Sequence, residues 1–525
     1  MHYTRLNPDL ENEELVILQE LLDVRLSNPG PLQLSENSLL SLVNTRGISL
    51  DGPDGPDKND KMLLFNPRLA TWCFLEGRER GLYDYLHEGS QYSTLLTASI
   101  LKVNGLGGRE RINKILAHLW ARGMLSVDGK SSLNQEIYQE GPLFKDLPMM
   151  ELLLTRRCNL GCAYCFAASN QKKQDMDLET ALKAVDQLME MPFNNFCIKF
   201  NGGEPLLRKD LLEKISSYTF ERFREIKREG FLLFEITTNG TLVDEEAIEL
   251  FKRFNMRVLI SIDGPEPLHN KYRTYQNGSP SFGDVIKGIR RLQDADYPFR
   301  VITVVTRENV LYPAEIIDFF SGMGITNLRF NPILKHGYGK DDWESKGIEP
   351  QEYLAFMKVV TARCGEGNSL HEDNLESMLR NMVSRMRDFK CMRSNCGCGH
   401  YYLCIDSTGD IYPCAFFLGE IPNLKLGYIH QEDVDLGECG GNHPLVKMLP
   451  SRSVGKIAAC SQCQWRHLCE GGCTLGAYLK SGTIFAPTYL CDYFKGMYTF
   501  LFNRLAKQPD FILRLLKEGV KVERV

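Results

Sequence analysis

The sequence has no run of about 18 apolar residues, which a membrane-spanning helix would need. Its start, MHYTRLNPDLENEELV, carries early acidic residues and no apolar core, so it does not resemble a secretory signal. The formal net charge of -5 at pH 7 provides no excess of positive charge for nucleic acid. We therefore expect a cytoplasmic protein whose partners are neither membranes nor nucleic acids.

The cysteines are numerous and unevenly distributed. There are 17 in all, three of them between Cys158 and Cys165 and eleven between Cys391 and Cys491. An odd total without a secretory signal argues against a disulfide scaffold. In a reducing compartment, clustered cysteines indicate metal or redox chemistry.

The first part of the chain has the pattern of a small separate domain. Residues 1–60 are polar, and LDGPDGPDKND at 50–60 predicts an exposed loop. The segment MLLFNPRLATWCF is strand-like, and two helical segments follow, the second of which places Ile112, Ile115, Leu116 and Leu119 on one face. We expect a winged-helix-like domain at 1–130 and a linker at 131–148.

From residue 149 onward, strand-like and helical segments alternate, which predicts an α/β fold with a parallel sheet. Six such units favour a partial (β/α)6 barrel, at 149–350, over a complete eight-fold barrel. Bridging helices are expected at 351–390, a cysteine-rich domain at 391–495 and a C-terminal helix at 496–525. The expected strands are 150–155, 196–200, 234–238, 258–262, 301–305 and 328–333, and the clearest helices are 178–191, 245–254 and 282–292.

The segment LTRRCNLGCAYCF places Cys158, Cys162 and Cys165 directly after the first of these strands. Three thiolates can bind three irons of a [4Fe–4S] cluster and leave the fourth iron open for a small molecule. The alternative is a zinc site, which normally needs a fourth protein ligand. No further cysteine or histidine lies close by in the sequence, since the next cysteine is Cys197.

At these residues the sequence resembles the radical S-adenosylmethionine (SAM) superfamily. The resemblance implies that SAM binds the open iron and is cleaved to a 5′-deoxyadenosyl radical, which abstracts hydrogen from a substrate. It also implies SAM contacts at successive strand ends, the face where such barrels build their sites. For Arg273, in the HNKYR segment, a surface charge is the alternative and the simpler explanation. The implied SAM-binding residues are Tyr164, Gly202, Gly203, Glu204, Thr238, Asn239, Ser261, Asp263 and Arg273.

The C-terminal cysteines resemble the SPASM extension of peptide-modifying radical SAM enzymes, which implies two auxiliary [4Fe–4S] clusters and three clusters in total. Structural zinc is the alternative. Cys398 is ambiguous between a ligand, a substitute for the family's small residue and a free thiol. Buried core thiols are expected at the cysteines without a partner at ligand spacing and at one strand position, namely Cys73, Cys197, Cys364, Cys439 and Cys404. One implied ligand set is Cys460, Cys463, Cys469 and Cys491, and the other is Cys414 and Cys473 with Cys396 and Cys391.

The resemblance also implies a ribosomally made precursor peptide as substrate, with its leader bound by the N-terminal domain through β-augmentation. The segment Cys391–Cys414 is similar to that of thioether-forming enzymes, while carbon–carbon crosslinking stays open. A formylglycine-generating sulfatase maturase is disfavoured because Ala415 follows Cys414 where those enzymes carry an acidic residue. A non-catalytic electron-transfer partner is the remaining alternative. The chemistry also requires a flavodoxin- or ferredoxin-like reductant.

Overall fold

The computed structural model describes most of the chain from residue 148 to residue 508 and several segments before it. The described residues are 34–35, 38–42, 45–49, 61–66, 71–76, 81–92, 109–121, 123–131, 148–170, 174–226, 230–365, 370–383, 397–399, 401–418, 425–432, 434–436, 444–508, 511 and 515. None of the helices formed by these residues is long and apolar enough to cross a membrane.

A ten-stranded sheet forms the centre of the molecule, in the order β14-β13-β12-β11-β10-β9-β8-β15-β16-β17. From β14 to β15 all neighbours are parallel, and β16 and β17 add antiparallel strands. The six expected strands are β8 to β13, which confirms an α/β fold with a central parallel sheet. The strands are β8 (Met149–Leu153), β9 (Phe196–Asn201), β10 (Leu232–Thr238), β11 (Arg257–Ser261), β12 (Phe299–Val305), β13 (Asn327–Pro332), β14 (His371–Glu372), β15 (Tyr402–Ile405), β16 (Asp410–Tyr412) and β17 (Gly427–Tyr428).

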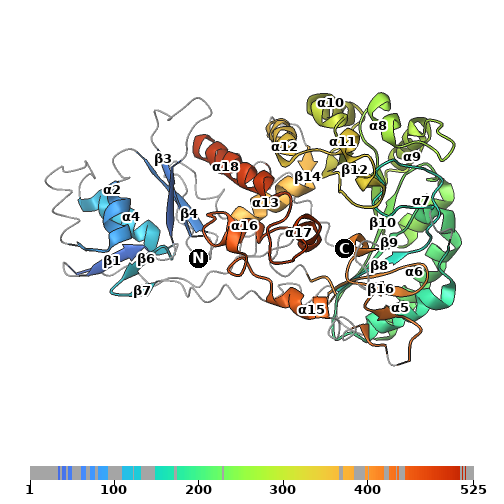
Figure 1. Ribbon diagram of the computed structural model, residues 1–525, viewed down its shortest axis with the longest axis horizontal. Coiled ribbons are helices and arrows are strands. Elements are labelled where there is room, and N and C mark those ends of the chain that lie inside the picture. The colour runs from blue at the N-terminus through green and yellow to red at the C-terminus, as the bar shows by residue number, and fades with distance from the viewer. Residues whose placement is uncertain are drawn as a thin grey trace.

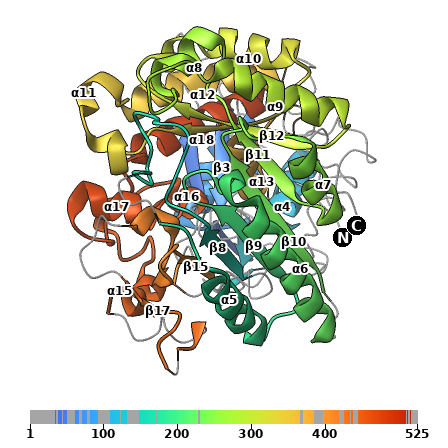
Figure 2. The same ribbon diagram turned by 90° about the vertical axis from the view of Figure 1, so that its right-hand side faces the viewer.

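Amphipathic helices cover one face of this sheet. Helices α5, α6 and α7 lie on its outer side, and the opposite face is turned toward α16 and α17 (Figures 1 and 2). The three helices expected at 178–191, 245–254 and 282–292 are α5, α7 and α9. The helices between the strands are α5 (Leu178–Glu190), α6 (Lys209–Glu225), α7 (Glu245–Arg253), α8 (Glu266–Tyr272), α9 (Phe282–Asp294) and α10 (Pro313–Gly322).

The C-terminal third is helical and rich in short elements. The two helical stretches expected after residue 350 are α12 and α13, and the expected last helix begins earlier, at Cys491. These elements are α11 (Trp343–Lys346), α12 (Pro350–Cys364), α13 (Asp373–Val383), α15 (Pro444–Met448), α16 (Arg466–Cys469), α17 (Thr474–Ser481) and α18 (Cys491–Lys507).

The N-terminal residues form two small sheets, in the orders β5-β1-β6-β7 and β2-β3-β4. The segment MLLFNPRLATWCF is a hairpin of two strands, β3 and β4, and not one continuous strand. Strands β1 and β2 were not expected, because the polar composition of this region conceals their short apolar runs. The expected loop at 50–60 and most of the linker lie outside the described residues. The elements are β1 (Leu39–Leu42), β2 (Arg46–Ser49), β3 (Lys61–Asn66), β4 (Thr71–Glu76), α2 (Gly81–Glu88), β5 (Ser90–Gln91), α4 (Arg109–Ala121), β6 (Leu125–Val127) and β7 (Lys130–Ser131).

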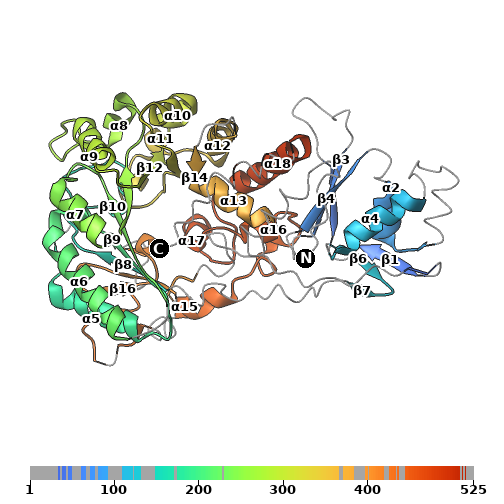
Figure 3. The same cartoon turned by 180° about the vertical axis from the view of Figure 1, so that it is seen from behind.

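An aromatic contact joins the N-terminal part to the cysteine-rich region. The ring of Phe65 on β3 lies 6.0 Å from that of Trp465 and 5.6 Å from that of Phe502 on α18, measured between centroids. Figure 3 shows β3 and β4 beside α18. Since Phe65 is fully buried, this contact is part of a packed interface.

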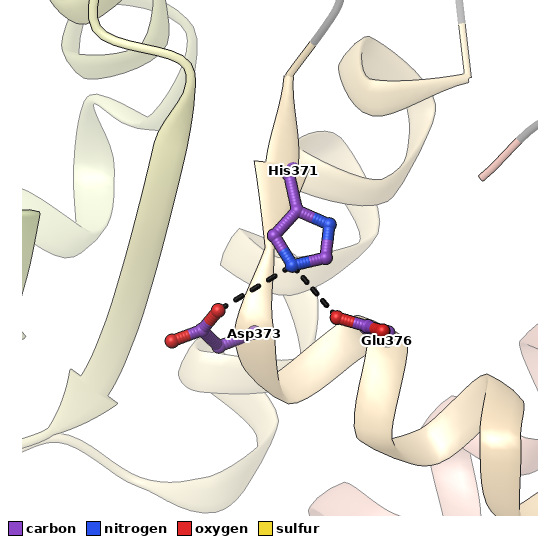
Figure 4. A group of neighbouring side chains, drawn as sticks. All are labelled: His371, Asp373 and Glu376. Carbon is purple, nitrogen blue, oxygen red and sulfur yellow. Dashed lines mark ion pairs between the residues drawn. The ribbon is translucent and has the colours of Figure 1, made fainter. Parts of the chain in front are cut away.

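A group of charged side chains lies where β14 runs into α13 (Figure 4). The ligand atoms of His371, Asp373 and Glu376 lie within 4.8 Å of one another, as metal ligands would. However, arginines already bind both carboxylates at 2.5 to 2.9 Å, and their positive charge opposes a metal ion. We therefore interpret the group as an ion-pair network that closes this end of the sheet. The arginines are Arg300 and Arg329 on Asp373 and Arg380 on Glu376.

The network predicts a pH-dependent contribution of His371 to stability. Burial alone lowers the pKa of His371, but hydrogen bonds to Asp373 and Glu376 outweigh it and raise the pKa to about 9. Because the folded-state pKa exceeds the usual value of 6.5, the stabilisation is fully present below about pH 6.5 and is lost as pH rises through about 9. We expect His371→Gln to cost on the order of 2 kcal/mol at pH 7.

Thermal melting of the unaltered protein and of the His371→Gln variant, from pH 6 to pH 10, measures this effect. The difference in melting temperature should shrink as the pH rises. His87→Gln, a change at an exposed histidine, serves as the control and should leave the melting temperature unchanged. A constant difference across this pH range would contradict the assignment.

Candidate functional site

The three-cysteine loop follows β8 and is held by backbone hydrogen bonds from two later segments. Within the loop, the Gly161 and Ala163 amides donate to the carbonyls of Thr274 and Tyr272, at 2.8 and 3.0 Å. On the other side, the Tyr338 amide donates to the Cys165 carbonyl at 2.9 Å. The chain after β11 and the chain after β13 thus fix the shape of the loop.

Of the three loop thiols, those of Cys158 and Cys162 lie in a low-dielectric environment. Burial is the largest influence on Cys158 and Cys162; it raises the pKa of Cys158 above the usual range and that of Cys162 to about 12. Neighbouring thiols raise the pKa values of Cys158 and Cys162 further, because two adjacent thiolates repel. Holding three thiolates here therefore requires a positively charged partner such as iron.

The spacing of the thiols argues against a mononuclear zinc site. In tetrahedral zinc sites, Zn–S bonds of about 2.3 Å place the sulfurs about 3.8 Å apart. Within the part of the chain that the structure describes, only the His371 group places three ligand atoms within 4.8 Å of one another. The three loop thiols therefore do not all lie within that distance of one another, which disfavours a mononuclear zinc site.

Glycines after β9 bring the backbone against the three-cysteine loop. Gly202 has a φ of +149°, and a Cβ there would lie 2.5 Å from the Thr155 carbonyl oxygen. A Cβ on Gly203 would lie 2.0 Å from the Arg157 carbonyl oxygen. Both positions therefore require glycine, because any side chain would displace the backbone next to Cys158.

Glu204 connects this glycine turn to the end of β10. Its carboxylate accepts hydrogen bonds from the Thr238 hydroxyl at 2.6 Å, the Asn239 amide at 2.7 Å and the Leu206 amide at 3.0 Å. Burial raises the pKa of Glu204 to about 7, although these bonds favour its charged form. The Asn239 side chain lies 3.8 Å from the Cys158 sulfur. Glu204 thus positions the polar strand ends around the three-cysteine loop.

Asp263, Tyr164 and Arg273 form a second buried group on the other side of the loop. The Tyr164 hydroxyl donates to Asp263, and Arg273 Nε lies 3.3 Å from an Asp263 oxygen. The Arg273 guanidinium lies 5.5 Å from the centre of the Tyr164 ring and 3.8 Å from the Cys162 sulfur. A surface role for Arg273 is therefore wrong, since its side chain is buried beside the thiols.

All nine expected SAM-binding residues lie at this edge of the sheet. Ser261 ends β11 and is buried near Asp263. The sequence analysis missed two asparagines that shape the loop. Asn170 accepts a hydrogen bond from the Cys158 amide at 2.8 Å, and Asn159 binds both Asn239 and Thr241. No spacing rule would have identified them, because they act through the local conformation of the loop.

Four of the expected C-terminal ligands line one pocket. Three of them sit at helix ends: Cys460 ends a short 3-10 helix, Cys469 ends α16, and Cys491 begins α18. The same pocket contains Cys463 and the exposed Lys495. Among the residues that the structure describes, no three of these four sulfur atoms lie within 4.8 Å of one another, as the ligands of a single metal ion would. The geometry therefore brings this predicted ligand set together.

The other C-terminal set is only partly described. Cys414 and Cys473 belong to the packed cluster that contains the buried Cys398, whereas Cys391 and Cys396 lie outside the described residues. Residues 470–472 all have positive φ, so the chain reverses after Cys469 and directs Cys473 into this second group. Cys404, Cys197 and Cys364 are buried, as expected.

The close approach at Gly203 predicts that Gly203→Ala disrupts the site. Because the added methyl would displace the Arg157 carbonyl, we expect SAM binding to weaken by roughly tenfold or more, about 1.4 kcal/mol. Equilibrium dialysis with radiolabelled SAM, on anaerobically reconstituted protein, measures this change. Gly283→Ala is the matched control, since nothing lies within 4 Å of a Cβ there. Equal SAM affinity of the two variants would contradict the assignment.

Comparison of the sequence with known proteins gives one family match and several relatives. Residues 152–320 match the model of the radical SAM superfamily. An uncharacterised protein of Methanocaldococcus jannaschii is 33% identical over 268 residues, which are 51% of this chain and 85% of that protein. A cysteine-type anaerobic sulfatase-maturating enzyme of Clostridium perfringens is 25% identical, over 68% of this chain and 98% of its own.

One further relative covers nearly the whole chain. The radical SAM cyclopropyl synthase TigE of Paramaledivibacter caminithermalis is 23% identical over 505 residues, 90% of this chain and 98% of its own.

Solved structures show the same fold. The anSMEcpe enzyme with bound AdoMet and the Cp18Cys peptide superposes with a TM-score of 0.61 at 23% identity, covering 69% of this chain and 98% of its own. Streptococcus suis SuiB bound to its precursor peptide SuiA superposes with a TM-score of 0.50 at 16% identity, covering 87% and 99%. With its three-cysteine loop and polar strand ends, the chain is a member of the radical SAM superfamily.

Proposed function

We propose that this enzyme modifies a ribosomally made precursor peptide by radical SAM chemistry and most readily installs a thioether crosslink. Membership of the superfamily implies a [4Fe–4S] cluster and SAM. The observation that carries the finer proposal is that cysteines far apart in the sequence gather into two groups in the C-terminal region, the pocket lined by Cys460 and its partners and the packed cluster of Cys398, Cys414 and Cys473.

In this proposal Cys158, Cys162 and Cys165 hold the cluster that binds SAM. When bound, cluster and SAM supply a 5′-deoxyadenosyl radical that abstracts hydrogen from the peptide. Glu204 orients the ends of β9 and β10, and Asp263 holds Arg273 and Tyr164 against the cofactor side of the loop. Because these groups are buried, they also exclude water from a reactive radical.

We assign the remaining cysteines to two auxiliary [4Fe–4S] clusters, three clusters in total. Cys460, Cys463, Cys469 and Cys491 would bind one, since they line a common pocket. Cys414 and Cys473 would bind the other together with Cys391 or Cys396, and the packing favours Cys398 as an additional ligand. Forming a carbon–sulfur bond from a substrate radical and a thiolate releases one electron, which an auxiliary cluster can accept.

The peptide substrate is supported by the relatives and by the N-terminal part. TigE spans 90% of this chain, and SuiB, whose structure holds a precursor peptide, resembles 87% of it in fold. In the described part of the N-terminal region, β2 and β4 are the outer strands of the three-stranded sheet. An outer strand can accept a leader peptide through backbone hydrogen bonds. We propose residues 1–130 as the leader-binding, winged-helix-like domain and 149–350 as a partial barrel.

A formylglycine-generating activity is the second candidate, because sulfatase-maturating enzymes are among the relatives. Ala415 follows Cys414 here and is buried in the first turn after it, so this position supplies no carboxylate. A carbon–carbon crosslink is a third outcome of the same radical chemistry.

Co-expression with short peptides encoded beside the gene, followed by mass spectrometry, tests the function. A loss of two hydrogens that also blocks thiol alkylation supports a thioether, whereas the same loss with a free thiol indicates a carbon–carbon bond. Purified enzyme and a flavodoxin-type reductant should form 5′-deoxyadenosine anaerobically. Absence of 5′-deoxyadenosine would contradict the enzymatic proposal.

The ligand assignment predicts that Cys398→Ser lowers the iron content. With Cys398 as a ligand, the variant should lose up to about four of about twelve irons per chain, because each cubane holds four. Cys404→Ser is the matched control, since Cys404 is a fully buried thiol outside the assigned sets. Colorimetric iron and sulfide analysis after anaerobic reconstitution measures the loss. Equal iron content in both variants would show that Cys398 is not a ligand, and Cys391 and Cys396 would then be the ligands that complete the set.

A further inference from the structure

A buried lysine lies against the three-cysteine loop and has no role in the site described so far. Lys346, at the end of α11, is only 7% exposed. Its ammonium donates to the Ala163 carbonyl at 2.9 Å, between Cys162 and Cys165 in the sequence, and to the Tyr338 carbonyl at 3.1 Å. The Tyr338 amide in turn binds the Cys165 carbonyl. Lys346 therefore connects the loop to the segment after β13 at two points.

The partners of Lys346 do not neutralise its charge. Both are neutral carbonyls, and no ion pair joins this ammonium to a carboxylate within the part of the chain that the structure describes. The acidic residues nearest in sequence, Glu344 and Glu349, are exposed. Burying a cation without a counter-charge costs several kcal/mol, so an anionic partner is expected close by. Three thiolates on an iron–sulfur cubane leave an excess of negative charge in this loop.

The segment that carries Lys346 is fitted tightly to the loop. Gly337 has a φ of +54°, and a Cβ there would lie 2.3 Å from the Phe166 carbonyl oxygen. The Tyr272 hydroxyl binds the carbonyl of Ser345, the residue before Lys346, and the Tyr272 carbonyl binds the Ala163 amide. The ammonium is thus held in place by packing on both sides.

We propose that Lys346 is a positioning residue of the iron–sulfur loop, which fixes the backbone between two ligands and supplies a buried positive charge that favours the reduced cluster. This rests on the assignment of Cys158, Cys162 and Cys165 as the ligands. A nearby cation stabilises the state with one more electron, because reduction adds negative charge to the cluster. Removing the charge therefore makes the cluster harder to reduce.

A redox titration of the full, anaerobically reconstituted protein, followed by electron paramagnetic resonance, tests the proposal. SAM addition identifies the relevant signal, since only a cluster with an open iron responds to it. At the potential where this signal is half-developed in the unaltered protein, Lys346→Met should lower the ratio of reduced to oxidised cluster by roughly tenfold, or 59 mV for one electron. Lys346→Gln keeps a hydrogen-bond donor but no charge, and it should lower the ratio of reduced to oxidised cluster by a similar factor.

Two variants serve as controls. Lys346→Arg keeps the charge and should restore the potential. Lys335→Met removes an exposed lysine of the same segment, whose ammonium lies 5.6 Å from the centre of the Trp343 ring, and should change nothing.

The possible outcomes separate the lysine from the ligand assignment. A Lys346→Met protein that keeps its melting temperature but loses only the SAM-responsive signal would also support the positioning role. Equal potentials for Lys346→Met and Lys335→Met would overturn it. If the unaltered protein shows no SAM-responsive signal, the assignment of the three ligands fails, and the role of Lys346 fails with it.

Discussion

The need to keep three thiolates together inside the protein governs the surroundings of the three-cysteine loop. Thiolates are costly in a low-dielectric interior, and each one makes the next more costly. The protein places two buried cations at the loop, Arg273 at the Cys162 sulfur and Lys346 at the Ala163 carbonyl. Arg273 is balanced in part by Asp263, whereas Lys346 donates to the carbonyls of Ala163 and Tyr338. This arrangement favours an anionic occupant.

The same loop is connected to the cysteine-rich region by an ion pair. Arg156, two residues before Cys158, lies 2.6 Å from Asp406, whose side chain is almost fully buried. Asp406 lies in the turn between β15 and β16, and Cys414 follows that hairpin directly. Since β15 also pairs in parallel with β8, the strand that leads into the loop, the two cysteine groups are positioned by one sheet. Their separation is therefore set by regular backbone geometry.

Much of this arrangement could be predicted because it depends on local patterns. Alternating strands and helices identified β8 to β13, and parallel strands necessarily bring their C-terminal ends to one edge. Contacts between distant segments could not be predicted. Nothing in the sequence marks Lys346 as buried, since it lies in a polar segment between charged residues. The choice among Cys391, Cys396 and Cys398 likewise depends on packing, because all three have a suitable spacing to Cys414.

The two faces of the central sheet differ in a way that follows from strand register. Glu151, Lys199 and Glu235 occupy the same level of β8, β9 and β10, so their side chains share one face. Lys199 and Glu235 lie 3.5 Å apart and keep 19% and 17% of their side-chain surface exposed, while Phe200 and Phe234 are packed on the helix-covered face. Because burying a charge is costly unless it is paired, the ion pair of Lys199 with Glu235 allows this face to carry charge, and the buried Glu151 beside them is held by hydrogen bonds from Asn201 and Tyr402.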